Sequence, residues 1–263
     1  MRNGLIWLVI IAIAVFGVYR FEKQKRPQKL PLMRGEVVGQ APDFASMNDI
    51  SERKEAFFSF LKPGVMYENS RILQERALLK RIKKDFADGQ LSSKNLVQAE
   101  RLASAYSFEL KDGNVDAAWI KEMLHRVDVI PEALVLTQAA NESAWGTSRF
   151  AQEANNYFGQ WCYNSGCGLV PLERVPGATH EVAKFDSVQD SILGYFMNVN
   201  RNAAYQELRE IRFQLRQKKK NPISDESAFA MSNGLLKYSE RGEAYVQDLQ
   251  VMMSANQKYW NDN

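Results

Sequence analysis

Histidine and cysteine are scarce in this chain of 263 residues, which contains two of each. The histidines are His125 and His180, and the cysteines, Cys162 and Cys167, lie close together in the stretch WCYNSGCG. A zinc site with two cysteine and two histidine ligands would need both histidines at the cysteine loop, and we do not expect them to converge there. We therefore predict no metal site.

A strong excess of charge is also missing. Charged residues make up 25% of the chain and hydrophobic residues 45%, and the net charge is +3. This is an ordinary mix for a globular protein, and the net charge is too small to imply a nucleic-acid partner. The length suffices for one large domain, or for a domain of about 150 residues with a helical extension.

An apolar run occupies residues 4–19 and ends at Arg20. It is short for a transmembrane helix and long enough for the core of a signal peptide, so residues 1–20 form either an uncleaved signal anchor or a cleaved signal peptide. A buried core helix ranks third, because the run begins near the N-terminus and is apolar on every side. Since no convincing cleavage site of small residues follows the run, the sequence favours the anchor.

The residues after this run are basic. Six basic residues and one acidic residue lie from Arg20 to Arg34, and residues 21–49 contain prolines without helical periodicity. We interpret residues 21–49 as a linker. The positive-inside rule would keep this segment in the cytoplasm, although long domains are exported largely regardless of the flanking charge.

Helical periodicity begins near residue 50. Ser51 caps a first helix, which the Lys-Pro-Gly sequence at residues 62–64 is expected to interrupt. A longer helix is predicted from about residue 65 to residue 88, and two more follow it. We interpret residues 50–128 as a helical extension.

One acidic side chain is well placed for proton transfer. Pro131 suits the first turn of a helix, the residues after it contain no helix breaker, and Gly146 is expected to end the helix. Glu142 shares a helix face with Gln138 and lies in the last turn, where the negative end of the helix dipole opposes its charge. The dipole and apolar neighbours such as Trp145 favour the protonated carboxyl that a general acid requires. For a single Glu considered alone, a solvated surface position is the simpler interpretation.

The residues around Glu142 form a longer pattern. Residues 137–159 read TQAANESAWGTSRFAQEANNYFG, which resembles the catalytic helix and following turn of the bacterial endo-β-N-acetylglucosaminidases, peptidoglycan hydrolases with a lysozyme-like fold. Spacing kept over such a length is far more specific than a short motif. The resemblance covers about residues 129–250. It implies a mostly α fold, in which a lysozyme-like catalytic domain with a small β-hairpin, residues 129–263, follows the helical extension and the membrane segment.

Two short β-prone segments, residues 168–174 and 180–185, flank a Val-Pro-Gly sequence and predict a small hairpin. The family carries a hairpin at this place, with a second acidic residue and a glycine four positions after it. Glu173 and Gly177 reproduce that spacing, and Glu181 on the return strand is the alternative. A solvated strand residue is the alternative interpretation of either glutamate, and it is the preferred one for Glu181.

The resemblance also implies catalytic roles. Glu142 would protonate the leaving glycosidic oxygen, and Glu173 would activate water. Alternatively, the acetamido group of the substrate would attack the anomeric carbon with help from a tyrosine. Phe185, Tyr195 and Tyr205 keep two intervals of ten residues that the family shows, which makes Tyr205 the match for its active-site tyrosine. Neither route requires a metal or a cofactor.

Aromatic side chains suit the faces of sugar rings, and the resemblance implies a set of substrate contacts. They are Trp145, Asn156, Phe158, Trp161, Glu181, Tyr238 and Tyr245. For the tyrosines, ordinary packing is the alternative.

Cys162 and Cys167 bracket an Asn-Ser-Gly turn. In an exported protein this pair most simply forms a disulfide that pins the loop, whereas both thiols would stay reduced if the topology were inverted. The bracketed loop after Phe-Gly-Gln-Trp resembles that of one particular member of the glucosaminidase family.

The resemblance implies hydrolysis of the β-1,4 bond between N-acetylglucosamine and N-acetylmuramic acid. The expected partners are the glycan strands of peptidoglycan and, through the N-terminal segment, the inner membrane. We expect a monomer on the periplasmic side of that membrane, or in the periplasm or secreted if the segment is cleaved. A lytic transglycosylase, which shares the Glu-Ser pair but carries a Gly-Leu-Met-Gln motif that is absent here, and a non-catalytic wall-binding protein are the alternatives.

Overall fold

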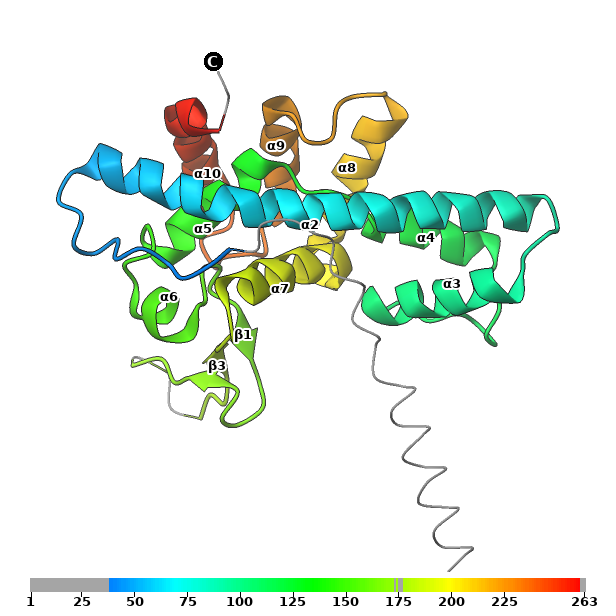
Figure 1. The fold of residues 1–263 in the computed structure, drawn as a ribbon, viewed down its shortest axis with the longest axis horizontal. Helices are drawn as coiled ribbons and strands as arrows, with labels where there is room; N and C mark the ends of the chain where they lie inside the picture. The colour runs from blue at the N-terminus through cyan, green and yellow to red at the C-terminus, as the bar shows by residue number, and fades with distance from the viewer. Residues whose placement is uncertain (1–37, 173, 175–176, 261–263) are drawn as a thin grey trace, which may run out of the picture.

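The structure is a computed structural model that describes residues 38–172, 174 and 177–260 (Figure 1). The expected N-terminal segment at residues 1–20, a large part of the expected linker, and Glu173 lie outside the described residues. Within these ranges, no helix is both long enough and apolar enough to span a bilayer.

A single long helix, α2 (Ile50–Ala87), runs along the whole molecule (Figure 1). The expected interruption at residues 62–64 does not occur, because the helix continues through Pro63. Its buried apolar side chains include Phe57, Phe58, Leu61, Val65, Ile72, Leu79 and Ile82. Burial of such side chains contributes about 1.5–3 kcal/mol each, which together outweighs the roughly 3 kcal/mol that an interior proline costs.

Gly64 lets α2 approach α7 (Val188–Arg201) closely. A Cβ atom at this position would lie 2.3 to 2.7 Å from side-chain atoms of Val38, Gln189 and Ile192. Because these distances are too short for a real Cβ contact, any larger residue would force the neighbouring side chains or helices apart. The Lys-Pro-Gly sequence therefore serves close packing in this fold and does not end a helix.

Two shorter helices pack against α2. They are α3 (Ser93–Ala105), capped by the Ser92 side chain, and α4 (Ala117–Arg126), capped by the Asp116 side chain. The apolar periodicity of the sequence predicts both helices, and the structure confirms them.

Helix α5 (Glu132–Ser143) lies at the centre of the fold and packs against α2, α9 (Asp225–Ser232) and α10 (Glu243–Asn256). Every residue from 133 to 140 is buried. The short helix α6 (Arg149–Ala154) follows it. Because interiors are packed as densely as organic crystals, a helix enclosed in this way holds the side chains at its ends in fixed positions.

The C-terminal part of the chain packs around α5. In chain order it contains α7, the 3-10 turn η1 (Ala203–Tyr205), α8 (Gln206–Gln217), α9, η2 (Asn233–Leu235), α10 and η3 (Gln257–Tyr259). Buried side chains from Val38 to Trp260 form one hydrophobic core. The expected boundary between residues 128 and 129 lies between α4 and α5 inside this shared packing, and the division into domains stays a prediction.

Three short strands form a small sheet in the order β1-β3-β2 beside α6 and α7 (Figure 1). They are β1 (Trp161–Cys162), β2 (Gly168–Leu169) and β3 (Glu181–Ala183), and β3 pairs antiparallel with both neighbours. The predicted hairpin is confirmed as the β2–β3 pair, whereas β1 is a strand that the sequence pattern does not indicate. The mostly helical fold with a small sheet agrees with the expected lysozyme-like class.

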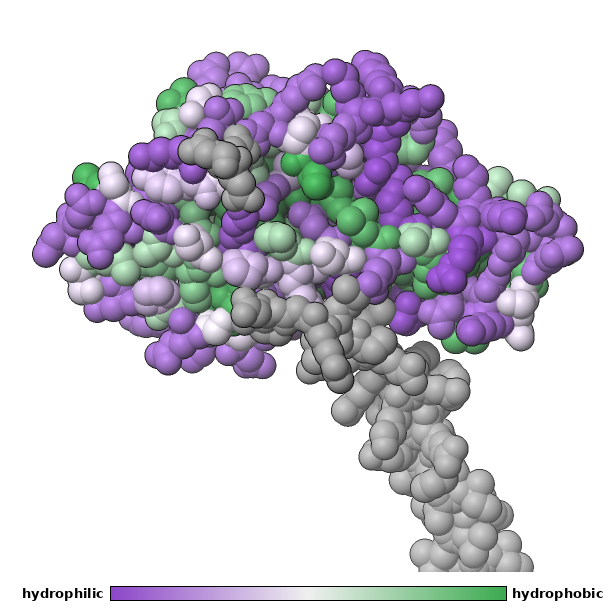
Figure 2. Space-filling model, turned by 45° about the horizontal axis from the view of Figure 1, so that its top comes forward, coloured by the Kyte–Doolittle hydropathy of each residue, from purple (hydrophilic) through white to green (hydrophobic). Residues whose placement is uncertain are grey.

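Hydrophilic residues cover most of the face shown in Figure 2, with apolar residues gathered near its centre. This surface fits a chain with 25% charged residues. Many large hydrophobic side chains lie inside, and Phe57, Phe158 and Phe196 among them are at most 1% exposed.

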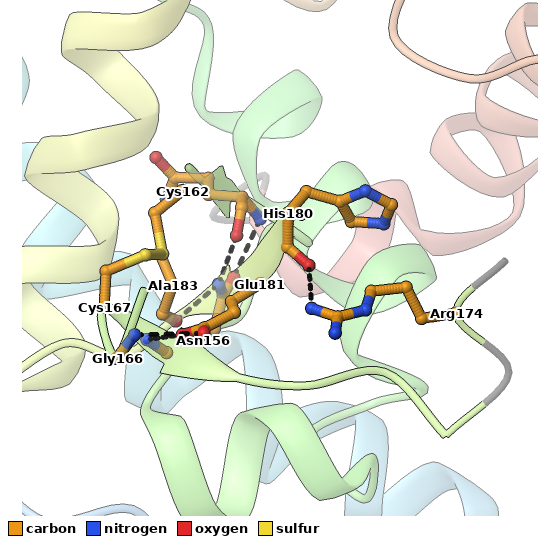
Figure 3. The surroundings of a disulfide bond; sticks show 10 residues. Asn156, Cys162, Gly166, Cys167, Arg174, His180, Glu181 and Ala183 are labelled. Carbon is orange, nitrogen blue, oxygen red and sulfur yellow. Dashed lines mark hydrogen bonds between the residues drawn. A yellow bond between two sulfur atoms is a disulfide. The ribbon is translucent and has the colours of Figure 1, made fainter. Parts of the chain in front are cut away.

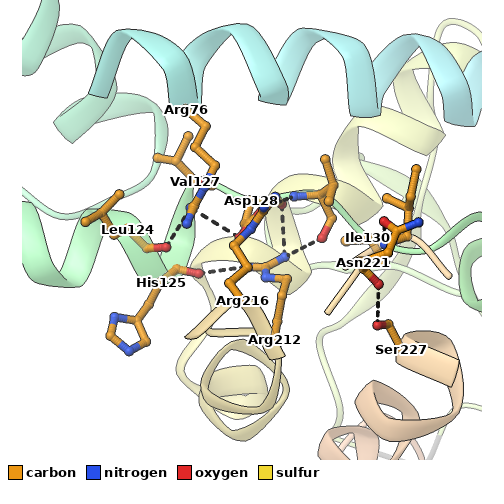
Figure 4. A network of polar contacts seen from close by, with 12 residues as sticks. Arg76, Leu124, His125, Val127, Asp128, Ile130, Arg212, Arg216, Asn221 and Ser227 are labelled. Atoms are coloured by element: carbon orange, nitrogen blue, oxygen red, sulfur yellow. Dashed lines mark hydrogen bonds and ion pairs between the residues drawn. The ribbon is translucent and has the colours of Figure 1, made fainter. Parts of the chain in front are cut away.

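A buried charge cluster holds the segment that joins α4 to α5 (Figure 4). Asp128 is 1% exposed and forms ion pairs with Arg76 on α2 and Arg216 on α8. Arg212 is fully buried and donates to the backbone oxygen of Asp128 at 2.9 Å. Three arginines therefore converge on the residue that lies just before α5.

The pKa of Asp128 shows which effect dominates in this cluster. Burial alone would raise that pKa, but the hydrogen bonds from Arg216 and the charges of Arg212 and Arg76 outweigh burial and lower it. A carboxyl whose pKa is lower in the folded than in the unfolded protein stabilises the fold above its ordinary pKa. This stabilisation is lost as the pH falls through the folded-state pKa.

We predict that Asp128→Asn destabilises the fold by about 3–5 kcal/mol, because it leaves buried arginine charge without compensation. Urea unfolding at neutral pH measures the free energy of unfolding of both proteins. Asp248→Asn is the matched control, since Asp248 pairs with Arg241 at the surface, with side chains 52% and 55% exposed. Such surface pairs contribute about 0–1 kcal/mol. Equal effects of the two substitutions would contradict the role given to Asp128.

Candidate active site

The last turn of α5 carries Glu142 and leads into a strained turn. The helix ends at Ser143, before the Gly146 that the sequence indicates as its end. Ala144, Trp145 and Gly146 have φ angles of 49°, 59° and 76°. The Ser143 hydroxyl accepts the Gly146 N–H at 2.9 Å and so stabilises this turn. Left-handed backbone at two consecutive non-glycine residues is costly and occurs often at functional sites.

Glu142 is half-buried, and its two carboxyl oxygens have different surroundings. Oε1 accepts hydrogen bonds from the Tyr245 hydroxyl at 2.8 Å and from the Asn141 amide at 3.2 Å. Oε2 faces Gly159, and a Cβ atom added at Gly159 would lie 3.3 Å from Oε2. Gly159 is exposed, and none of the described residues donates a hydrogen bond to Oε2. Within the described residues, Oε1 is thus the hydrogen-bonded oxygen of this carboxyl, and Oε2 is the oxygen next to an exposed glycine.

Burial raises the pKa of Glu142, and the hydrogen bonds from Tyr245 and Asn141 reverse this effect only in part. The carboxyl is therefore protonated over a wider pH range than that of a solvated glutamate, as a general acid requires. Trp145, the apolar neighbour expected at this place, packs against Phe57 of α2 with ring centroids 5.7 Å apart.

Four tyrosines lie around Glu142, and Tyr238 is the central one. Its ring centroid is 5.6 Å from that of Tyr245, 5.7 Å from that of Tyr205 and 6.4 Å from that of Tyr195. Burial raises the pKa of all four hydroxyls, and the negative charge of Glu142 also raises each of them. The four phenols therefore stay neutral, and Tyr245 donates its hydroxyl proton to Glu142.

The expected site residues differ in exposure within this cluster. Tyr245, expected as a substrate contact, is 1% exposed and donates its hydroxyl proton to the acid, while Tyr205 is 7% exposed. Phe158, another expected contact, is 1% exposed and stacks on Tyr195 at 4.3 Å between centroids. Tyr238 is half-buried and donates to the Phe158 backbone oxygen at 2.8 Å. Of these expected contacts, Tyr238 presents the most surface.

Asn156 joins the turn after α6 to the sheet. Its side-chain nitrogen donates to the backbone oxygens of Gln160 at 2.9 Å and Ala183 at 2.8 Å, and its oxygen accepts the N–H groups of Phe158 and Gln160. The side chain is 1% exposed. Because an asparagine amide forms about four hydrogen bonds at most, all of its capacity is used inside the chain.

The two histidines lie on different elements. His180 stacks on Trp161 with ring centroids 4.2 Å apart, and Trp161 remains 55% exposed beside the turn that holds Gly159. His125 lies on α4 and contacts Glu210 at 3.1 Å. The pair therefore does not meet at the cysteine loop, and Trp161 presents an exposed aromatic surface two residues after Gly159.

Cys162 and Cys167 form a disulfide with a Cα–Cα distance of 6.2 Å (Figure 3). Glu181 is 7% exposed, and its carboxylate oxygens accept the N–H groups of Gly166 at 3.0 Å and Gly168 at 2.8 Å. These two hydrogen bonds lower the pKa of Glu181. The residue expected as the alternative second acid is thus bound to the cysteine loop.

Among the described residues, Cys162, Cys167 and Glu181 form the group whose atoms lie close enough together to hold a metal ion. The disulfide removes both thiolates, and a single carboxylate does not make a zinc site. This group therefore fits a structural role in the loop.

Sequence-based reasoning missed the roles of Gln138 and Gly159. Gln138 lies one helical turn before Glu142 and donates to the Tyr245 hydroxyl at 2.9 Å. The spacing of four residues is visible in the sequence, but the contact with a tyrosine more than a hundred residues away is not. Gly159 belongs to the recognised turn, yet its closeness to the acid depends on the folded chain.

Comparison with known proteins gives two consistent results. The family model described as mannosyl-glycoprotein endo-beta-N-acetylglucosaminidase matches residues 117–258, which include α5, the four tyrosines and the small sheet. The chain therefore belongs to the glucosaminidase family and has the domain of a glycan hydrolase. It is similar to the protein Bax of Escherichia coli (strain K12), with 33% identity over 217 residues that cover 82% of this chain and 74% of Bax. The expected family is confirmed. No solved structure gives a significant match.

We predict that Glu181→Gln loosens the cysteine loop, because the amide turns an N–H₂ group toward one of the two backbone donors. Hydrogen–deuterium exchange at Gly166 and Gly168 will become faster, while the amides of α5 keep their protection. Glu153→Gln, on the exposed side of α6, is the matched control. Unchanged exchange at both glycines would show that Glu181 does not anchor the loop.

Proposed function

We propose that this protein hydrolyses the β-1,4 bond between N-acetylglucosamine and N-acetylmuramic acid in peptidoglycan, with Glu142 as the general acid. The observation that carries the proposal is the Glu142 carboxyl, whose pKa is raised and whose two oxygens have different surroundings. Its Oε1 is held by Tyr245 and Asn141, and its Oε2 faces the exposed Gly159. Membership of the glucosaminidase family supports a glycosidic bond as the target.

In the proposed reaction, protonated Glu142 transfers its proton from Oε2 to the glycosidic oxygen. The bond between this oxygen and the anomeric carbon breaks as the new O–H bond forms. Glu142 becomes a carboxylate in this step, and the hydrogen bonds from Tyr245 and Asn141 stabilise the new charge. Burial keeps the acid protonated before the step, and fixed donors support the carboxylate after it.

For the second role we propose Glu173, which would remove a proton from the attacking water. Glu181 is less suited to this role, because two backbone N–H groups already bind its carboxylate and lower its pKa. In the alternative route, the acetamido oxygen of the substrate attacks the anomeric carbon and Tyr205 stabilises the intermediate. Tyr205 lies next to Tyr238 in the tyrosine cluster.

Two aromatic residues are the best candidates for substrate contact, since Tyr238 is half-buried and Trp161 is 55% exposed. We propose that they carry sugar rings on either side of the cleaved bond. The proposed substrate lies outside the cytoplasmic membrane. We therefore also propose that the protein acts as a monomer on the periplasmic side, held at the inner membrane by residues 1–20.

We predict that Glu142→Gln lowers cleavage by at least about 100-fold, because the amide keeps the shape of the side chain and has no acidic proton. The full-length chain is incubated with purified peptidoglycan, and mass spectrometry identifies the new chain ends. Glu153→Gln is the control, and thermal melting checks the fold of each variant. Reducing N-acetylglucosamine ends that disappear in Glu142→Gln support the proposal, whereas full activity of that variant refutes it. Chain ends that carry anhydro-muramic acid would indicate a lytic transglycosylase. The absence of any new chain ends would indicate a binding protein.

We further predict that Glu173→Gln lowers kcat by about 100-fold or more while Glu181→Gln has a smaller effect. The reason is that the proposed base must accept a proton in the reaction, whereas Glu181 acts on the loop. Steady-state kinetics on a soluble glycan fragment measure kcat and KM for each variant. Near-normal kcat in Glu173→Gln together with a large loss in Tyr205→Phe would favour the acetamido route.

A further inference from the structure

A line of three hydrogen bonds connects the core to Glu142. The Tyr195 hydroxyl donates to Gln138 Oε1 at 2.5 Å, Gln138 Nε2 donates to the Tyr245 hydroxyl oxygen at 2.9 Å, and the Tyr245 hydroxyl donates to Glu142 Oε1 at 2.8 Å. Tyr195 and Gln138 are fully buried, and Tyr245 is 1% exposed. The line therefore runs through the interior and ends at the acid.

The direction of these bonds decides which oxygen of Glu142 carries the proton. A tyrosine hydroxyl has one proton to donate, and Tyr245 directs it to Oε1 because Gln138 presents its N–H₂ group on the other side. An oxygen that already accepts a strong hydrogen bond is the poorer place for a proton. The acidic proton then resides on Oε2, which faces Gly159.

A rotated Gln138 amide would reverse the line. Its oxygen would then accept the Tyr245 proton, and Tyr245 would in turn accept a proton from Oε1 of Glu142. The acidic proton would be held on the oxygen that faces the core. The two directions use the same atoms at the same distances, so another contact must choose between them.

Tyr195 makes that choice. Its hydroxyl is fully buried, and among the described residues Gln138 Oε1 is the acceptor of its proton. With the amide rotated, the Tyr195 hydroxyl would face an N–H₂ group and lose its acceptor, which is unfavourable inside a protein. The ring of Tyr195 is itself fixed, because it stacks on Phe158 at 4.3 Å.

We propose that Gln138 and Tyr195 are positioning residues that set the direction of the hydrogen bond from Tyr245 to Glu142, and so keep the transferable proton on Oε2. This inference rests on the proposed role of Glu142 as the acid. Neither residue touches the substrate in this scheme. Both act through Tyr245, and their effect lies in the chemical step and not in substrate binding.

The other titratable groups near Glu142 do not provide this control. In the part of the chain that the structure describes, they are Tyr205 and Tyr238, which burial and the charge of Glu142 keep neutral. Among the described residues, no charged side chain shifts the pKa of Glu142. A change in the pH dependence of the acid therefore reports on the line through Gln138.

Tyr195→Phe and Gln138→Met test the proposal in the full-length chain. We expect both to lower kcat by about 10- to 100-fold, the effect of one hydrogen bond to a charged group, with KM changed less than about twofold. In both variants the direction of the Tyr245 hydroxyl is no longer fixed, so its hydrogen bond to the Glu142 carboxylate is weaker on average and the pKa of Glu142 rises. Because a general acid is lost as the pH rises through its pKa, the alkaline limb of the kcat profile will move to higher pH.

The matched control is Tyr67→Phe, which removes a phenol hydroxyl from α2, outside the site. A second measurement follows the Glu142 carboxyl by carbon-13 NMR during a pH titration, and it needs no substrate. Tyr195→Phe keeps its ring and decides the outcome if Gln138→Met does not fold. A higher pKa of Glu142 in Tyr195→Phe than in Tyr67→Phe supports the proposal.

The outcomes separate this inference from the proposed function. If Glu142→Gln is inactive but Tyr195→Phe keeps the wild-type kcat, pH profile and carboxyl titration, the proposed role of Glu142 is supported and the inference on Gln138 and Tyr195 is overturned. A lower kcat with an unshifted pH profile also overturns it, because that result indicates a purely structural role. If Glu142→Gln remains active, the proposed function itself fails.

Discussion

The buried contact between Asp128 and the arginines of α2 and α8 is the constraint on which the site depends. It ties the long helix and a C-terminal helix to the segment that enters α5. Asn69 adds two hydrogen bonds to the backbone of Ile130, at 2.8 and 3.0 Å, in the same segment. Glu142 lies at the other end of α5, about 15 Å away at a rise of about 1.5 Å per residue. Because the middle of α5 is buried from residue 133 to residue 140, fixing its first turn also fixes the position of Glu142 in its last turn.

The two carboxyls at the ends of this segment have pKa values shifted in opposite directions, although burial alone would raise both. Arginine charges outweigh the desolvation of Asp128 and lower its pKa, so it stays ionised and holds the fold together. Glu142 has only neutral donors, Tyr245 and Asn141, and desolvation prevails, so its pKa is raised. The opposite pKa shifts of Asp128 and Glu142 are therefore explained by their hydrogen-bonding and charged partners and not by burial. The same functional group thus has a lowered pKa at one place in the fold and a raised pKa at another.

The sequence predicts the parts of this structure that depend on neighbouring residues. The start of α5 just after Pro131, the placement of Glu142 in its last turn and the β2–β3 hairpin all follow from local patterns. What it does not predict depends on distant contacts: α2 continues through Pro63 because packing against α7 outweighs the local cost, and β1 forms only because β3 reaches it. Likewise, Glu181 looks like a solvated strand residue until the folded cysteine loop supplies its two N–H partners.

The two sides of the site are built by different means, and this difference has a physical reason. The acid is on a twelve-residue helix inside a hydrophobic core, where packing alone fixes its position. The sheet on the other side has strands of two and three residues, which are too short to hold their own register. A disulfide and the bonds from Glu181 to the loop supply the missing constraint. The position of Glu142 therefore depends on the packing of the core, whereas the shape of the small sheet depends on the cysteine loop.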